Sequence, residues 1–193
     1  MNNSYTTEQF LHLQDQLLLS AQSSAAQQSL WTRLDLLLGH YLLLRGDNRW
    51  AAELSELSVL QYPASEGPTP CWVLVLQNEQ SKTNQQGDLL YSGAMRHWNP
   101  RLCTMGALAQ YLFWRWHISG EPAPNFQRRQ DWYRLKVLVG EQPTKELAYS
   151  THYDVCLSAL QKAGISSKDI THVPRSSGTQ EAERLGTGEG QIS

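Results

Sequence analysis

The sequence predicts a mainly helical α+β domain with a small antiparallel β-sheet. Several segments place apolar residues on one stripe at helical spacing, whereas the continuous apolar run Cys71–Leu76 is typical of a buried strand. The chain has 193 residues, 40% of them hydrophobic, which is enough to bury one core. We therefore expect a single domain over residues 1–185. The glycine-rich residues 186–193 are expected to form a disordered or truncated tail.

The first third of the chain is predicted to be helical. The segment Thr6-Thr7-Glu8 is expected to supply the N-cap of a helix, apolar residues at helical spacing follow, and a polar connection covers residues 20–28. A second helix is expected from about Ser29 to Leu44, because its leucines recur on one stripe. The turn-forming residues Arg45–Arg49 predict a break, and a third helix is expected at Trp50–Leu57.

The middle of the chain predicts a β-hairpin followed by an apolar helix. After a Pro/Gly/Ser-rich loop at Pro63–Pro70, the strand Cys71–Leu76 leads into a polar turn at Asn78–Gly87. Residues Asp88–Ser92 are expected to form the return strand. Beyond an Asn-Pro break, the apolar segment Cys103–His117 predicts a buried helix.

The last third predicts one short strand and two helices. Leu135–Val139 is expected to form the strand. A helix is expected from Tyr149 to Ala163, with Gly164 directly after it as the glycine that ends the helix. A final short helix is expected at Ser176–Leu185.

The charge of the chain is unevenly distributed. Sixteen basic and 18 acidic residues give a net charge of −2, which argues against a histone-like nucleic-acid binder. Residues 93–136, however, hold seven basic residues against two acidic ones, a net charge of +5, which leaves −7 for the remainder. Two interpretations of this segment stay open: a phosphate-contacting face, or the solvated side of a helix and loop.

The cysteines and the N-terminus suggest a soluble intracellular protein. Cys71, Cys103 and Cys156 are too widely separated to predict a disulfide framework or a metal-binding pair, so we expect buried thiols. The N-terminus lacks the features of a signal peptide, and no apolar run is long enough to span a membrane.

The segment His172-Val-Pro-Arg175 places an imidazole and a guanidinium about one helical turn apart. This pair suits a single phosphodiester, because arginine donates two parallel hydrogen bonds to phosphate oxygens and histidine can donate a hydrogen bond or carry a proton. The pattern is not specific by itself. A surface histidine and arginine near the start of a helix would give the same sequence.

Three further features precede this pair in a characteristic order. The basic residues Arg45 and Arg49 close the second helix, Lys82 stands in the hairpin turn, and the aromatic helix follows. This order resembles the catalytic domain of the tyrosine recombinases. The blocks Ser81-Lys-Thr-Asn-Gln85 and Cys103-x-x-Gly-Ala-Leu-Ala109 are more specific. They resemble the recombinase-derived domain of fungal Crypton elements and of the large DNA-binding subunit of the budding-yeast centromere complex.

The resemblance implies a site for phosphodiester chemistry that lacks its nucleophile. In tyrosine recombinases a tyrosine beyond the His-x-x-Arg segment attacks the DNA phosphate. Two arginines and a histidine stabilise the transition state, and the hairpin lysine protonates the leaving oxygen. All eight tyrosines of this chain precede His172, and the Gly-Trp or Gly-His element after the motif is missing. We therefore expect the recombinase catalytic-domain fold, truncated at its C-terminus, and no enzymatic activity.

The resemblance also implies the residues that contact phosphate, whereas no catalytic residue, metal ligand or cofactor is expected. The expected phosphate contacts are Arg45, Arg49, Lys82, Arg96, His97, His172 and Arg175.

Several alternatives to these roles stay open. Arg45 and Arg49 are both candidates for the first recombinase arginine, and Arg49 could instead pair with Glu53 on a helix surface. Lys82 could be an ordinary turn lysine, and Arg96 with His97 could be surface charges at a strand end. We expect Trp114 and Trp116 to pack at the core, because an i, i+2 pair on a helix cannot face one ligand.

The expected function is binding of double-stranded DNA through backbone phosphates in the nucleus by a catalytically inactive domain. One alternative is a truncated fragment of an active Crypton-type recombinase. The other is a protein-interaction module that kept the fold but not the DNA face. A homodimer and other chromosomal proteins stay open as further partners, and neither a membrane nor a small-molecule substrate is expected.

Overall fold

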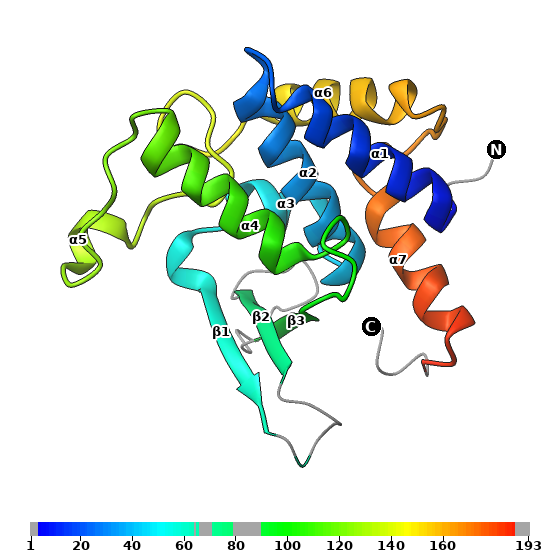
Figure 1. Cartoon of the computed structure of the whole chain (residues 1–193), viewed down its shortest axis with the longest axis horizontal. Helices are drawn as coiled ribbons and strands as arrows, with labels where there is room; N and C mark the ends of the chain where they lie inside the picture. Colours follow the sequence, from blue (N-terminus) through cyan, green and yellow to red (C-terminus); the bar gives the residue numbers. More distant parts are fainter. Residues whose placement is uncertain (1–3, 64, 66–70, 79–89, 188–193) are drawn as a thin grey trace.

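The computed structural model describes residues 4–63, 65, 71–78 and 90–187. The helices are α1 (Thr7–Ser20), α2 (Ala26–Tyr41), α3 (Gly46–Ala51), α4 (Thr104–Phe113), α5 (Arg129–Trp132), α6 (Tyr149–Lys162) and α7 (Val173–Arg184). The strands are β1 (Leu57–Tyr62), β2 (Cys71–Asn78) and β3 (Leu90–Met95), which form one antiparallel sheet in that order (Figure 1). The predicted mainly helical α+β fold with a small antiparallel sheet is confirmed.

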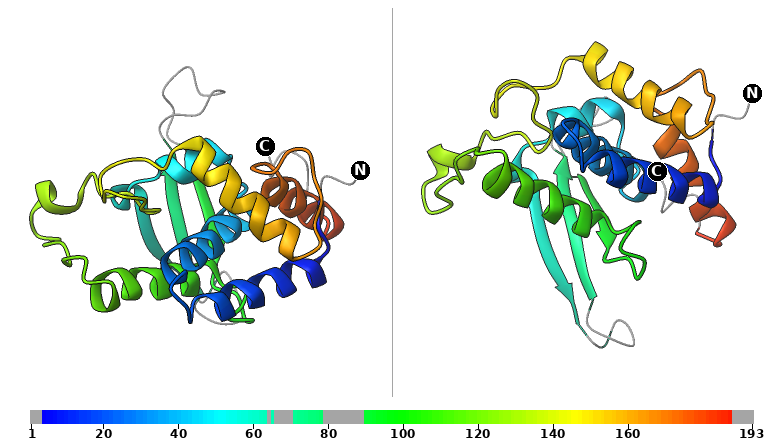
Figure 2. Two further views of the ribbon diagram at one scale, coloured as in Figure 1. Left: turned by 90° about the horizontal axis from the view of Figure 1, so that it is seen from above. Right: turned by 45° about the horizontal axis from the view of Figure 1, so that its top comes forward.

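Helix α2 lies at the centre of the helical part. Every residue from Ser29 to His40 is buried, and α2 contacts α1, α3, α4, α6 and α7. Seen from above, α2 runs between α1 and α4 on one side and α6 on the other (Figure 2). A helix that is covered on all sides needs apolar residues around most of its circumference, which the Leu-rich sequence of α2 supplies.

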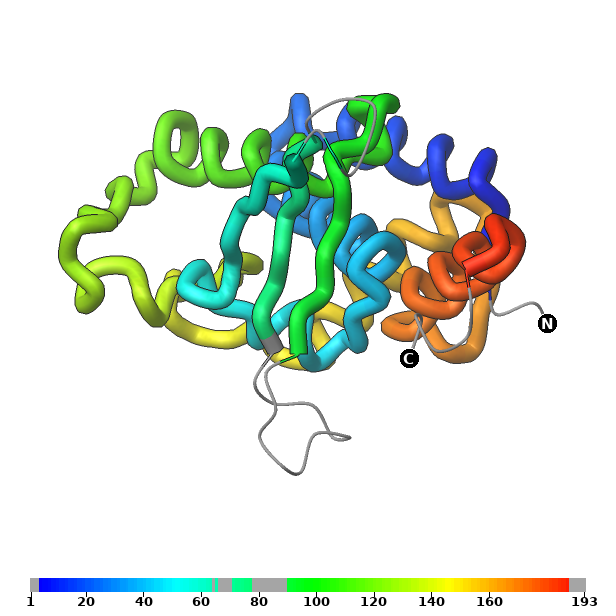
Figure 3. Tube along the Cα trace, turned by 90° about the horizontal axis from the view of Figure 1, so that it is seen from below, coloured from blue at the N-terminus to red at the C-terminus, as the bar shows by residue number. Residues whose placement is uncertain are grey.

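In the part of the chain that the structure describes, helices cover one face of the sheet only. Leu74, Leu76 and Ala94 are buried on the face that contacts α4. On the other face Leu60, Val73 and Met95 are aligned across the three strands, and no helix crosses this face in Figure 3. Leu60 and Met95 are exposed, whereas Val73 is buried between them, so this outer face is apolar.

Two predicted helix ends are confirmed in detail. The Thr6 side chain accepts a hydrogen bond from the Gln9 backbone N–H at 3.2 Å, and the Gln9 side chain accepts one from the Thr6 backbone N–H at 2.9 Å. This reciprocal pair is a capping box. At the end of α6, Gly164 has a φ of +71° and Ile165 donates its backbone N–H to the Leu160 carbonyl. These are the features of a Schellman motif, which glycine favours because it has no Cβ.

The predicted helix Trp50–Leu57 is wrong. The chain is helical over Gly46–Ala51, where a turn was expected, and forms a 3₁₀ turn at Leu54–Glu56. Residue 57 then begins β1, a strand that the sequence analysis did not predict. Most of β1 is exposed, so its sequence carries no core-facing alternation, and only pairing with β2 defines it.

The predicted strand Leu135–Val139 is also wrong. Lys136 forms one isolated bridge with Glu53, and the segment continues as a buried loop. Its apolar residues Val137 to Val139 are buried because the loop passes through the core, which an apolar run alone does not distinguish from a strand.

Other predictions are confirmed with shifted limits. Helix α2 begins at Ala26, inside the segment that was expected to be a polar connection, and β3 extends to Met95. Helix α7 begins at Val173, so the His-x-x-Arg segment forms its first turn. The predicted hairpin turn, which includes Lys82, and most of the loop Pro63–Pro70 lie outside the described residues.

Candidate functional site

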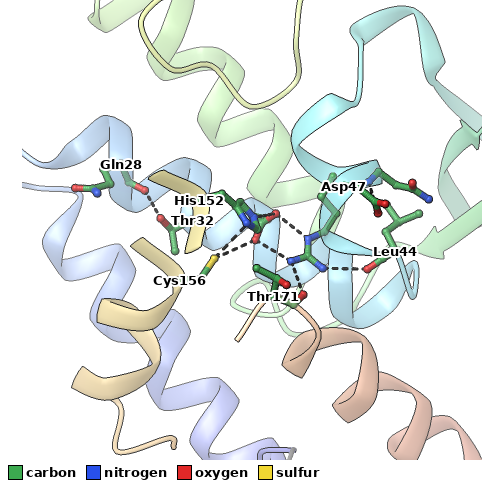
Figure 4. Close-up of polar contacts among 10 residues, drawn as sticks. Gln28, Thr32, Leu44, Asp47, His152, Cys156 and Thr171 are labelled. Carbon is green, nitrogen blue, oxygen red and sulfur yellow. Dashed lines mark hydrogen bonds and ion pairs between the residues drawn. The ribbon is translucent and has the colours of Figure 1, made fainter. Parts of the chain in front are cut away.

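Arg49 connects three segments in the interior. Two of its partners, Leu44 and Thr171, are labelled in Figure 4. It is fully buried, and its Nε donates to Asp35 Oδ1 on α2 at 2.8 Å. Its two terminal nitrogens donate to the backbone carbonyls of Leu44 at 2.9 Å and Thr171 at 3.0 Å. Because Thr171 directly precedes His172, Arg49 fixes the start of α7 relative to α2 and α3. Its partner is Asp35, so the alternative pairing with Glu53 is wrong; Glu53 pairs with Lys136 instead.

The Asp35 carboxylate has two further neighbours on α6. His152 Nε2 lies 3.0 Å from Asp35 Oδ1, and the Cys156 thiol donates to Oδ2 at 3.5 Å. Burial would raise the pKa of Asp35, but the Arg49 guanidinium and the hydrogen bonds from Arg49 and His152 outweigh it and hold this pKa well below its usual value. Burial and the Asp35 carboxylate raise the pKa of Cys156, which keeps it a thiol.

These same residues bring three potential metal-ligand atoms close together. Asp35, His152 and Cys156 place an oxygen, a nitrogen and a sulfur within 4.8 Å of one another. However, the Arg49 guanidinium already neutralises the carboxylate. A divalent cation would have to bind beside this fixed positive charge, so the cluster is better explained as a hydrogen-bond network that joins α2, α3 and α6.

Two glycines allow α7 to pack closely against α2. A Cβ on Gly39 would lie 2.7 Å from the Pro174 Cβ and 2.6 Å from an Arg49 nitrogen. A Cβ on Gly178 would overlap with the backbone carbonyl of His40. Only glycine fits at such a close helix contact. The position of α7, and therefore of the His-x-x-Arg segment, depends on these two residues.

This packing brings three of the predicted residues to one cleft. Arg45, directly before α3, His172, directly before α7, and Arg175, in the first turn of α7, line a cavity of about 1080 Å³. His172 is exposed, and the two arginines are half-buried. Arg45 and Arg175 are 130 positions apart in the sequence, so only the tertiary structure places them together.

The two arginines of the cleft repel each other. Burial and the positive charge of Arg45 lower the pKa of Arg175, and Asp47 offsets part of this effect. Among the described residues no carboxylate forms an ion pair with either guanidinium. Two guanidiniums that share a cleft without paired carboxylates can bind a phosphate bidentately.

The remaining predicted residues lie elsewhere. Arg96 and His97 follow β3 and line a second cavity of about 680 Å³. They are therefore at a strand end, and the structure does not bring them into the cleft of Arg45. Arg49 lies beneath that cleft with no exposed surface. Lys82 is outside the part of the chain that the structure describes.

The basic segment 93–136 does not form one charged face. Arg115 is buried and pairs with Glu121, and Lys136 is buried beside Glu53. Arg101 pairs with Asp15 at the surface. Trp114 and Trp116 are half-buried and pack against the core, as the sequence predicted.

The cleft also holds residues that were not predicted from the sequence. Trp50, Tyr149, Tyr153 and Lys168 line it together with the predicted arginines and histidine. They come from α3, α6 and the segment before α7, and no local pattern marks them. Their position in one cleft is a consequence of the packing of these elements around α2.

Comparison with known proteins gives one family and one fold. A family model described as "Centromere DNA-binding protein complex CBF3 subunit, domain 2" matches residues 3–193. No curated protein matches the chain.

Two solved structures of the XerH site-specific recombinase are similar in fold. The complex with difH substrate before cleavage has a TM-score of 0.65 at 13% identity and covers 99% of this chain and 46% of that chain. The complex with palindromic difH substrate after cleavage has a TM-score of 0.61 at 14% identity and covers 95% and 43%. The chain thus spans less than half of these recombinase chains. The similarity confirms the predicted tyrosine-recombinase catalytic-domain fold.

None of the described helices is both long and apolar enough to cross a membrane.

Proposed function

The chain belongs to the family of the centromere DNA-binding protein complex CBF3 subunit, domain 2, and from this premise we propose that it binds duplex DNA through backbone phosphates without cutting it. The observation that carries the proposal is the cleft that holds Arg45, His172 and Arg175. In the recombinase chemistry these residue types bind one phosphodiester. Here they lie together although they come from distant parts of the sequence.

Each residue of this phosphate clamp has a distinct role. The guanidiniums of Arg45 and Arg175 bind the phosphate oxygens, and their mutual repulsion is relieved when the anion binds. The exposed His172 donates a further hydrogen bond. We assign Arg49 a positioning role, because its donors are directed at Asp35, Leu44 and Thr171. This assigns the first arginine of the clamp to Arg45.

The clamp should contact only a few phosphates. Arg45, Arg175 and Lys168 line the cleft, but the carboxylates of Asp47, Asp169 and Glu183 line it too. Each neutralised phosphate contributes a slope of about 0.9 to the dependence of log affinity on log salt. We therefore expect a slope of about 2 to 3 from this cleft. Lys82, Arg96 and His97 stay proposed as additional phosphate contacts.

The absence of cleavage rests on the position of the tyrosines. Residues 173–193 contain none, whereas the recombinase nucleophile lies beyond the His-x-x-Arg segment. Tyr149 and Tyr153 line the cleft from α6, which precedes the motif. We expect no covalent protein–DNA adduct after denaturation of the complex. An adduct would instead support the alternative that the chain is part of an active recombinase.

The family also indicates where the protein works. A subunit of a centromere DNA-binding complex acts on chromosomes, so we propose a nuclear location and other chromosomal proteins, or a second copy, as partners.

The decisive experiment is a salt series of duplex-DNA binding, measured by fluorescence anisotropy. Arg45→Gln and Arg175→Gln should each lower the salt slope by about one and weaken binding, because each removes one phosphate contact. Lys162→Gln is the matched control, since Lys162 is exposed at the end of α6 and does not line the cleft. If the folded wild-type protein shows no salt-dependent binding, the proposal is wrong and the interaction-module alternative gains support.

A further inference from the structure

The cleft that holds the phosphate clamp also has an aromatic side. Trp50, Tyr149 and Tyr153 line it together with Arg45 and Arg175. The rings of Trp50 and Tyr149 meet edge to face, with centroids 5.7 Å apart and planes at 72°. Tyr153 continues this row 6.0 Å from Tyr149. A phosphate alone makes no use of such a surface.

The aromatic row is anchored in the interior. Trp50 packs edge to face on His152, with ring centroids 4.9 Å apart, and His152 is held by Asp35. On its other side the Trp50 ring lies over the backbone of Gly46, where a Cβ would lie only 2.8 Å from it. Trp50 is therefore fixed, and it supports Tyr149 in a defined orientation.

Tyr149 lies between Trp50 and Tyr153 in this row and is largely accessible. It is 57% exposed and is the first residue of α6. Its ring therefore contributes little to the core, and as an aromatic residue at the start of a helix it supplies no capping group. An accessible ring on a fixed support is a suitable surface for a flat apolar ligand.

The carboxylates of the cleft point to the same kind of ligand. Asp47 and Glu183 line the cavity beside the arginines, although they repel a phosphate. Carboxylates accept hydrogen bonds from the exocyclic amino groups of nucleobases. In one nucleotide, the cations would bind the phosphate, the aromatic rings would stack on the face of the base, and the carboxylates would accept hydrogen bonds from its edge. The cavity of about 1080 Å³ is large enough to hold it.

We propose that the aromatic side of this cleft binds an unpaired DNA base, stacked on Tyr149, next to the phosphate that Arg45 and Arg175 clamp. This inference rests on the proposed function and adds a preference to it. A base in intact duplex DNA is covered by its neighbours and cannot reach the ring. The protein therefore selects DNA with an unpaired base, such as a bulge or the end of a gap, over fully paired DNA.

The test compares two DNA molecules with the full chain at one salt concentration. One is a short duplex, and the other is the same duplex with a single extrahelical base. We expect the second to bind about tenfold more tightly, since stacking of one base on an aromatic ring is worth about 1–3 kcal/mol. Tyr149→Ala should reduce this ratio to about one, and Tyr149→Phe should restore it because the ring is retained.

Tyr91→Ala is the matched control, because Tyr91 is 63% exposed on β3 and does not line the cleft. It should leave the ratio unchanged. As a second readout, an unpaired 5-iodouracil should photo-crosslink to the peptide that contains Tyr149.

The outcomes separate this inference from the proposed function. Equal affinity for both DNAs, or a crosslink outside α3 and α6, overturns the stacking site; salt-dependent binding that Arg175→Gln weakens would leave the phosphate clamp standing. If neither DNA binds, both proposals fail.

Discussion

Asp35 and Arg49 form a fully buried ion pair, and such pairs are costly to break. Both side chains have no exposed surface, and the Arg49 Nε lies 2.8 Å from Asp35 Oδ1. Removing one partner leaves the other charge in the interior without compensation. The pair therefore specifies how α2, α3 and the start of α7 fit together, rather than adding much to stability by its net energy.

We expect Asp35→Asn to lower the free energy of unfolding by about 3–5 kcal/mol, because Arg49 then stays buried without a counter-charge. Urea denaturation measures this change. Asp15→Asn is the control, since the Asp15–Arg101 pair is exposed and should contribute less than about 1 kcal/mol. Similar losses in both variants would contradict the special role of Asp35.

The Asp35 pKa also predicts the pH dependence of stability. This pKa is lower in the folded protein than in the unfolded chain, so the contribution of Asp35 is fully present above about pH 4. It is lost as the pH falls further and the carboxylate becomes protonated. The stability difference between wild type and Asp35→Asn should therefore shrink below about pH 4 in urea titrations. A difference that grows on acidification would contradict this assignment.

At the scale of elements, the contact between α2 and α7 positions the clamp. Gly39 and Gly178 let the two helices approach closely, and Arg49 ties the residue before His172 to α2. A further link joins them, because His40 Nε2 lies 2.8 Å from Glu181 Oε2 and lowers the pKa of that carboxyl by hydrogen bonding. Helix α7 therefore has little freedom to shift without breaking these contacts.

Gly178→Ala should lower the free energy of unfolding by about 1–3 kcal/mol, because the new Cβ overlaps with the His40 carbonyl and pushes α7 outward. The displacement of His172 and Arg175 should also weaken duplex-DNA binding. Gly106→Ala is the control, since a Cβ there makes only ordinary contacts of 3.5 and 3.6 Å with Cys103, directly before α4. It should be neutral or stabilising by about 0.4–1 kcal/mol. Equal destabilisation by both changes would show that the α2–α7 contact is not special.

At the scale of the whole molecule, the phosphate clamp exists only in the folded chain. Arg45 and Arg175 reach one cleft because α3 and α7 both pack on α2. A ligand that binds the folded state alone stabilises it by mass action.

We expect duplex DNA at a hundred times its Kd to raise the free energy of unfolding by about 2.7 kcal/mol at low salt. The double variant Arg45→Gln, Arg175→Gln should show much less stabilisation at the same DNA concentration. Thermal unfolding followed by far-UV circular dichroism measures both. Equal stabilisation of the two proteins would place the DNA contacts outside the cleft.

The fold class, the family and most of the helices can be predicted from local patterns in the sequence. The capping box at Thr6 and the glycine after α6 are local signals, because the groups that form them are adjacent in the chain. The resemblance to the centromere-complex subunit is confirmed by the family match over residues 3–193. The sequence also predicted Arg45, His172 and Arg175 as phosphate contacts, and the structure brings these three residues to one cleft.

The sequence does not show which of these residues are buried and which line the cleft, because this depends on how the helices pack. Arg49 is buried and hydrogen-bonded to Asp35, whereas Arg45 lines the cleft, although both are arginines and only four positions apart. The strand β1 forms by pairing with β2, and Tyr149 lines the cleft because α6 packs beside it. The physical reason is the same in each case. Burial, strand pairing and the convergence of side chains arise from contacts between residues far apart in the chain, and no local pattern records them.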